Sequence, residues 1–255
     1  MMKYYDRFLA MKIFTFTEAV KLIGNEKTAK SLLQQYCRKG YIASVKKGLY
    51  VAVNIVDKEP LLNKFAIASA LTDTSFVSYR SAFEYYGYAN QVSYDVSVTS
   101  AQKFNSFVFN GYSYNRTAPT VNGGIVIQTD GVRVSDIERT VIDCINSLDT
   151  KIGLEELLSC ISAIPVLNEK KLTEYLDEYD KRFLYQKTGF LLEHFQFDLS
   201  ENFFDFCKHK SGKSSRYFTK NIPKDAMGFS SKWHLTYLRN IWGDLLNGGS
   251  EYADI

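Results

Sequence analysis

Hydrophobic residues near the N-terminus repeat with a helical period. Over residues 26–39 they follow the spacing i, i+3, i+4, i+7, i+8, which is the stripe of a helix that packs one face on a small core: Ala29, Leu32, Leu33, Tyr36 and Cys37. An earlier helix begins at Thr15, where Glu18 completes a capping box, and Gly24 separates the two helices. The spacing of Tyr4, Tyr5, Phe8 and Leu9 predicts one more short helix before them.

Two β-prone runs follow this pair of helices. Residues 41–45 and 49–53 are joined by Lys46-Lys47-Gly48, a tight turn that contains a glycine. Helix, helix and hairpin in this order predict a winged helix-turn-helix domain over residues 1–57, with two cations at the tip of the wing. The charged segment Asp57-Lys58-Glu59-Pro60 marks its boundary.

The pattern becomes mixed beyond Pro60. Helices are predicted over residues 61–71 and 78–86, the second capped by Ser78 and stopped by Gly87. Alternating apolar residues from Val92 to Val98 predict a strand. Two Asn-Gly or Asp-Gly pairs, at residues 110–111 and 130–131, each lie between β-prone runs and predict hairpins.

The remaining pattern is mainly helical. Ser135 and Glu138 form a second capping box that opens a helix, and apolar stripes of helical period continue after Gly153. The predicted fold class is therefore α+β: a winged helix-turn-helix over residues 1–57, a mixed α/β-hairpin domain over residues 58–150, and a mostly helical C-terminal extension over residues 151–255 packed on it.

The polar face of the second helix has the chemistry of a DNA-reading surface. Cations suit phosphates, and hydroxyl and amide side chains suit base edges, when a helix enters the major groove. The predicted DNA-binding residues are Lys27, Thr28, Lys30, Ser31, Gln34, Gln35 and Arg38 on the helix, with Lys46 and Lys47 on the wing. The alternative is that the helix face is only solvated and that the two wing lysines protect an exposed hairpin edge from aggregation.

Charge distribution favours DNA. Residues 1–58 carry 11 Lys and Arg and 4 Asp and Glu, which gives a net charge of +7. The rest of the chain carries 20 Lys and Arg and 24 Asp and Glu, which gives a net charge of −4. The whole chain has a net charge of only +3, so the positive charge is concentrated at its N-terminal end. This distribution is expected when one domain binds the phosphates of a nucleic acid. An apolar run long enough for a membrane span and a signal-peptide core are both absent from the sequence, which favours a cytoplasmic location without membrane association. The four scattered cysteines are expected to be buried thiols.

Several segments together resemble the AbiEi family. They are residues 38–42, 46–51, 78–87, 135–143, 187–193 and 231–233, so the likeness extends over nearly the whole chain. The most specific element is the string D-x-E-R-T-x-x-D from Asp136 to Asp143. The family comprises antitoxins of type IV toxin-antitoxin systems in abortive-infection phage defence. This chain departs from the family in length: the segment after the helix at residues 135–148 is longer than in the minimal form of the family.

The resemblance implies a bacterial transcriptional autorepressor. Its winged helix would bind operator repeats in double-stranded DNA, with the possibility of two copies binding cooperatively. Its C-terminal domain would counter a nucleotidyltransferase-like toxin, functionally paired with it but without a stable complex. The alternatives are a winged-helix module that docks protein, and a stand-alone transcription regulator without a toxin partner.

The family motif has two open interpretations. Asp136, Glu138, Arg139, Thr140 and Asp143 are either a structural network or a functional surface. Ser135 and Glu138 already cap the predicted helix, Asp136 suits its N-terminal dipole, and Arg139 and Asp143 are spaced i, i+4 for an ion pair.

Catalysis is not expected. The histidines, His194, His209 and His234, lack the spacing of metal ligands, and no glycine-rich phosphate-binding loop is present. Asp95 and the carboxylates of the family motif are conceivable Mg²⁺ ligands. Carboxylates on helices are, however, usually solvated or paired with cations, which argues against a metal site. The prediction is a protein that is not an enzyme, with no cofactor and no metal.

A second basic segment covers residues 208–224, which hold six cations and no acid. Lys210, Lys213, Arg216 and Lys220 would form a second nucleic-acid surface, with Tyr217 and Phe218 available for stacking. The alternative is a flexible, solvated loop.

Overall fold

The computed structural model describes residues 4–195, 197–240 and 242. Over these residues the chain is an α+β protein with ten α-helices and three β-sheets. It divides into two compact units, one made of Met1–Val77, Tyr94–Ala118 and Ile127–Val134, the other of Ser78–Ser93, Pro119–Val126 and Ser135–Ile255. The division at residues 57/58 and 150/151 stays a prediction. Over the described ranges, every helix is too short or too polar to cross a membrane.

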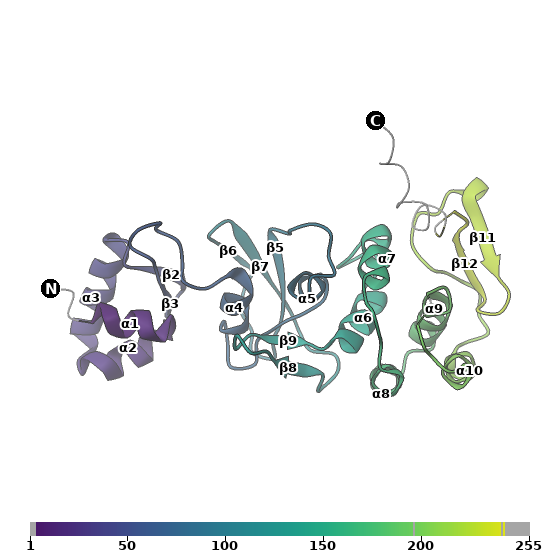
Figure 1. The fold of residues 1–255 in the computed structure, drawn as a ribbon, viewed down its shortest axis with the longest axis horizontal. Helices are drawn as coiled ribbons and strands as arrows, with labels where there is room; N and C mark the ends of the chain where they lie inside the picture. Colours follow the sequence, from purple (N-terminus) through teal and green to yellow (C-terminus); the bar gives the residue numbers. More distant parts are fainter. Residues whose placement is uncertain (1–3, 196, 241, 243–255) are drawn as a thin grey trace. The chain divides into compact units, whose positions relative to one another are not determined.

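The first unit begins with three helices and a hairpin (Figure 1). The elements are α1 (Tyr5–Met11), β1 (Ile13–Thr15), α2 (Phe16–Ile23), α3 (Glu26–Arg38), β2 (Ile42–Lys46) and β3 (Leu49–Ala52). The strands form an antiparallel sheet in the order β1-β3-β2. The predicted capping box of Thr15 and Glu18 is confirmed, and the Asn25 side chain caps α3 by accepting from the Thr28 amide at 3.0 Å.

These elements enclose an apolar cluster of their own. Its buried members all lie between residues 5 and 42, and the rings of Phe8 and Phe14 stack in its centre with their centroids 4.3 Å apart. From α3 the cluster takes Leu33 and Tyr36, with Leu32 and Cys37 packed against it, as the apolar stripe predicts. The polar face of α3 is consequently turned away from this core.

A six-stranded mixed sheet follows, in the order β6-β7-β5-β4-β9-β8. Its strands are β4 (Phe76–Val77), β5 (Asp95–Thr99), β6 (Phe107–Phe109), β7 (Tyr112–Thr117), β8 (Ile125–Ile127) and β9 (Arg133–Ser135). Both predicted hairpins are present, and Asn110 and Gly111 have φ of 48° and 79°, the left-handed pair that a tight hairpin turn requires. The helix predicted over residues 61–71 is shorter: α4 (Lys64–Ser69) begins after Asn63, whose side chain caps it.

The second unit is mainly helical. Its helices are α5 (Arg80–Tyr85), α6 (Ile137–Asn146), α7 (Leu154–Ser162), α8 (Glu169–Tyr179), α9 (Arg182–Leu192) and α10 (Glu201–Lys210). Leucines and aromatic residues from these helices share one apolar cluster. A small sheet in the order β10-β12-β11, with a 3-10 turn, follows them: β10 (Arg216–Tyr217), η1 (Lys224–Ala226), β11 (Met227–Ser230) and β12 (Leu235–Leu238). The sequence pattern did not predict this sheet.

Two predicted helix starts were wrong. The N-cap of α5 is Tyr79, which has a φ of 53° and makes no side-chain cap, rather than Ser78. The N-cap of α6 is Asp136, whose side chain accepts from the Arg139 amide, rather than Ser135. Ser135 instead exchanges a hydrogen bond with Thr140 at 2.7 Å, and the Glu138 side chain accepts from the Asn168 amide. The capping box predicted for α6 fails because the Ser135 hydroxyl bonds with Thr140 and the Glu138 carboxylate accepts from the amide of Asn168, 30 residues away.

Candidate nucleic-acid interface

The outer face of α3 is exposed and polar. Every predicted DNA-binding residue on this helix is exposed: Lys27, Thr28, Lys30, Ser31, Gln34, Gln35 and Arg38. Among the described residues, no salt bridge engages Lys27, Lys30 or Arg38. The face therefore combines unpaired cations with amide and hydroxyl groups on one rigid helix, which is the arrangement that contacts phosphates and base edges.

The two lysines of the hairpin turn differ from each other. Lys47 is exposed, whereas Lys46 is half-buried with its Nζ 5.2 Å from the centre of the Phe104 ring. Burial lowers the pKa of Lys46 from its ordinary value. The cation of Lys46 is thus already engaged by an aromatic face of the same unit, and Lys47 is the freer of the two for a phosphate.

A shallow hollow beside the turn adds one more cation. It has a volume of 750 Å³ and is lined by Lys46, Lys47 and Gly48 of the turn and by Gln102 and Lys103 of the loop after β5. Arg133 also borders it, but its guanidinium donates to the carbonyls of Ser69, Thr72 and Asp73 and so closes the end of α4. Lys103 is exposed, and the sequence pattern gave no reason to group it with the hairpin turn because about 55 residues separate them in the chain.

The family motif lies inside the second unit. Asp136, Glu138, Arg139, Thr140 and Asp143 are all buried, Arg139 and Asp143 at 2% exposure each. The Arg139 guanidinium lies 3.4 Å from Asp143, which confirms the predicted i, i+4 ion pair, and it also donates to the backbone carbonyls of Val121 and Gly123. These bonds fasten the loop before β8 to α6.

Two tyrosines and a lysine of α8 complete this buried network. The Tyr175 hydroxyl donates to Asp136 at 2.7 Å, the Tyr179 hydroxyl donates to Asp143 at 2.6 Å, and Lys171 pairs with Asp136 at 3.0 Å. Burial raises the pKa of Tyr175 and of Tyr179, and the accepting carboxylates raise it further. Burial likewise raises the pKa of Asp143, against the opposing effect of Tyr179 and Arg139.

The structure therefore favours the structural interpretation of the motif. The five motif residues are buried, and their polar groups bond with one another and join α6, α8 and the loop at residues 121–124. In the sequence, Tyr175 and Tyr179 belong to one of the apolar stripes after Gly153, together with Leu172, Leu176 and Phe183. Their hydroxyl partners come from another helix and have no signal in the sequence.

The cations of the second basic segment have different surroundings, and the nucleic-acid surface stays a prediction. Lys210 ends α10 and pairs with Asp177 at 3.0 Å, the Arg216 guanidinium lies 5.2 Å from the Phe183 ring centre, and Lys213 and Lys220 are exposed. Phe218 is fully buried, so the prediction that it is available for stacking was wrong, because its ring completes the core beside Phe190. Tyr217 remains 58% exposed.

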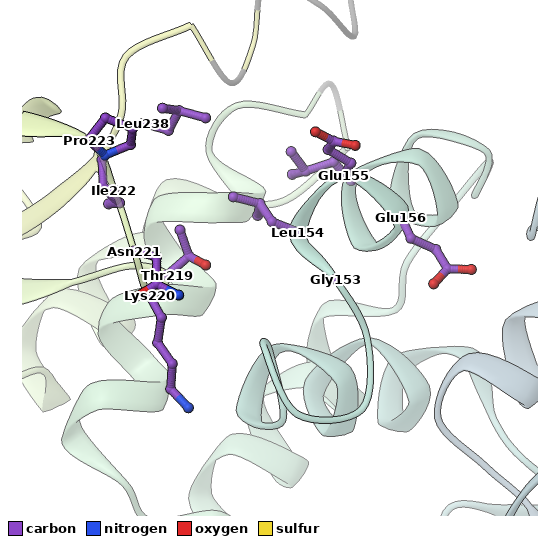
Figure 2. A pocket seen from close by; sticks show the side chains of 11 residues that line it. Gly153, Leu154, Glu155, Glu156, Thr219, Lys220, Asn221, Ile222, Pro223 and Leu238 are labelled. Atoms are coloured by element: carbon purple, nitrogen blue, oxygen red, sulfur yellow. The ribbon is translucent and has the colours of Figure 1, made fainter. Parts of the chain in front are cut away.

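A cavity of 650 Å³ lies between the start of α7 and the segment that follows β10 (Figure 2). Leu154, Ile222 and Leu238 give it an apolar character, and Glu155 and Glu156 stand at its helical side. Glu156 is engaged by Arg80, and the Lys220 side chain extends away from the two acids. Among the described residues no group of three or more histidine, cysteine or acidic side chains is placed to hold a metal ion.

Comparisons with known proteins show a similarity of fold to a solved structure, without a match in sequence families. Neither the known protein-family models nor the curated proteins include a match to this sequence. Among solved structures, the chain is similar to the RV2827C protein from Mycobacterium tuberculosis, with a TM-score of 0.64 and 12% sequence identity over 92% of this chain and 89% of that one. Likeness at this identity extends to the fold alone.

Proposed function

We propose that the chain is a DNA-binding transcriptional regulator whose α1–α3 and β2–β3 hairpin form a winged helix. The observation that carries this proposal is the outer face of α3, where every polar residue is exposed and the cations lack acidic partners in the described part of the chain. A surface helix of this kind, next to a hairpin turn with an exposed lysine, has the parts that winged helices use on duplex DNA.

The proposed division of labour separates affinity from specificity. Lys27, Lys30, Arg38 and Lys47 hold phosphates, and Lys103 extends this contact beside the hairpin turn. Ser31, Gln34 and Gln35 lie in the middle of α3 and read base edges in the major groove. Lys46 contributes mainly by holding the turn against Phe104.

The antitoxin role rests on the resemblance to the AbiEi family. On that basis the chain represses its own operon and counters a nucleotidyltransferase-like toxin, without a stable complex between the two and without an enzymatic activity or cofactor of its own. The buried position of the family motif supports a role in stability for Asp136, Arg139 and Asp143, not in contact with a toxin.

Titration against DNA tests the regulatory proposal. The purified chain is titrated with the duplex upstream of its own gene and with a scrambled duplex, each at two salt concentrations. We expect tighter binding to the upstream duplex and a steep salt slope shared by both. Equal affinity for both duplexes at both salt concentrations would overturn the repressor and favour a winged helix that docks protein.

Growth of a host culture tests the antitoxin role separately. The gene adjacent to that of this chain is expressed alone and together with it. Arrest of growth by the neighbour alone and recovery on co-expression are expected. If the neighbour is harmless, the chain is a stand-alone regulator.

A further inference from the structure

A second cavity of the helical unit has a cationic and aromatic lining. It has a volume of 530 Å³. Phe183 and Lys187 of α9 form one wall, the segment from Tyr217 to Ile222 forms another, and Asp149 lies at its edge. The same segment also borders the apolar cavity at the start of α7, in which the Lys220 side chain extends away from the acidic residues (Figure 2).

Lys187 is a largely buried lysine that lines this cavity. It is 8% exposed, and its Nζ lies 4.7 Å from the ring centre of Phe183 and 5.8 Å from that of Phe218. Within the described ranges of the chain, neither a carboxylate nor a hydrogen-bond acceptor pairs with this ammonium. Buried ammonium groups are normally paired because removing them from water is costly. The rings of Phe183 and Phe218 stabilise the Lys187 charge only in part, and an anion bound in the cavity would add a full ionic partner.

The acid in the lining is already occupied. The Asp149 carboxylate accepts from the Thr219 hydroxyl at 2.5 Å and from the Lys220 amide at 2.9 Å. The negative charge of Asp149 raises the pKa of Lys187, and the positive charge of Lys220 lowers it. Outside the lining, the Arg216 guanidinium lies 5.2 Å from the centre of the Phe183 ring. Two cations, Lys187 and Lys220, therefore line the cavity with one carboxylate whose oxygens are already engaged.

We infer that this cavity binds a phosphorylated nucleoside, either as a free nucleotide or within a single strand. Lys187 and Lys220 hold the phosphate, since charge-assisted hydrogen bonds to phosphate are strong. The base stacks on the Tyr217 ring, which is 58% exposed at the rim. This site belongs to the second unit and does not depend on DNA binding by α3.

Calorimetric titration of the full chain tests this inference. The probes are AMP, adenosine, inorganic phosphate and a short single strand of thymidines. AMP is expected to bind at least about tenfold more tightly than adenosine or phosphate, since both halves of the ligand contribute. Tighter binding of the single strand than of AMP would identify the strand as the source of the nucleotide.

Proton uptake provides a readout specific to Lys187. Burial lowers the pKa of this ammonium to about 8, and a bound phosphate raises it again. Binding of AMP at pH 8 should therefore take up protons, which titration in two buffers of different ionisation enthalpy measures. Lys187→Met is expected to abolish the uptake and to weaken AMP binding about tenfold or more.

The control variants separate the site from charge in general. Lys170→Met removes an exposed lysine of the same unit that does not line the cavity, and it should leave AMP binding unchanged. Tyr217→Ala should weaken AMP and leave inorganic phosphate unaffected. Absence of binding for all four probes, or the same loss in Lys170→Met as in Lys187→Met, would overturn the site. Equal affinity for phosphate and AMP would overturn the nucleoside.

Discussion

Lys187 is a lysine whose acid-base chemistry departs strongly from its ordinary behaviour. Burial lowers its pKa from 10.5 to about 8. Between these two pH values the lysine is protonated in the unfolded chain and neutral in the folded chain, so the free energy of unfolding rises with pH. Below pH 8 the lysine is charged in both states, and the full cost of burying its charge lowers the stability of the fold. Lys187→Met keeps the apolar stem and removes the charge. We expect it to raise the free energy of unfolding at pH 7 by on the order of 2 kcal/mol, as urea denaturation measures.

The pH dependence supplies the control for this prediction. The advantage of Lys187→Met should shrink as pH rises from 8 toward 10.5, because the wild-type lysine then loses its proton in the folded state. Lys170→Met changes an exposed lysine and should alter stability by less than about 0.5 kcal/mol. A less stable Lys187→Met protein at pH 7 would show that the ammonium makes a net stabilising contact, contrary to the prediction.

Arg139 is the residue on which the buried family motif depends. Its guanidinium neutralises Asp143 and holds two carbonyls of the loop at residues 121–124. Arg139→Ala leaves the Asp143 carboxylate buried without its cation, which should lower the free energy of unfolding by about 3–5 kcal/mol. Arg182→Ala, at an exposed position on α9, should cost less than about 0.5 kcal/mol.

Functional assays decide between the two interpretations of this motif. If Arg139 serves the scaffold, DNA binding and toxin neutralisation should fall only in proportion to the folded fraction of the variant. A variant of near wild-type stability with lost antitoxicity would instead reveal a functional surface. Circular dichroism and growth assays on the same protein distinguish these outcomes.

At the scale of elements, the sequence predicted those whose signals are local. Thr15 with Glu18 located the start of α2, and Asn110-Gly111 located the β6–β7 turn, because each signal is complete within four residues. Ser78 and Ser135 are not the N-caps of α5 and α6. For α6 the reason is that Ser135 bonds with Thr140 and that Glu138 accepts from the distant amide of Asn168. The two-residue strand β10 has no alternating pattern to detect, and its partner β12 is distant in sequence.

The exposed helix α3 and the hairpin turn make separable contributions to DNA binding. Lys47→Ala should weaken binding to every duplex alike and reduce the salt slope by about one, because Lys47 contacts a phosphate. Lys46→Ala should reduce the slope less, since its cation already faces Phe104. Gln35→Ala should cost about 1–3 kcal/mol on the preferred site alone. Titrations of specific and random duplexes measure these effects, and equal loss on both duplexes for all three variants would contradict the division.

At the scale of the molecule, the sequence could not give the order of strands. In the six-stranded sheet β5 pairs in parallel with β7 and antiparallel with β4, and β4 pairs in parallel with β9. Parallel pairs join segments that are far apart in the chain, so neither periodicity nor turn signals encode them. The candidate cavity at Lys187 was missed for the same reason. The position looks like an ordinary polar residue until Phe183 and Phe218 surround it.

The predicted domain boundaries lead to a test with fragments. All seven buried members of the N-terminal cluster lie between residues 5 and 42, so a fragment of residues 1–60 carries its own core. A domain of this size buries only about 60% of its unfolded surface, so it should melt cooperatively but at modest temperature. A fragment of residues 1–150 retains Val141, Ile142 and Ile145 of α6 without α7, α8 and α9, which cover them in the full chain.

The longer fragment should therefore be the less well folded of the two. Its uncovered apolar residues are expected to bind a hydrophobic dye and to promote aggregation, in contrast to the shorter fragment and the full chain. Dye fluorescence and circular dichroism melts compare the three proteins under one condition. If residues 1–150 melt cooperatively without binding dye, the predicted domain of residues 58–150 is a true folding unit. In that case α6 would reach its stable packing before the helical extension is added.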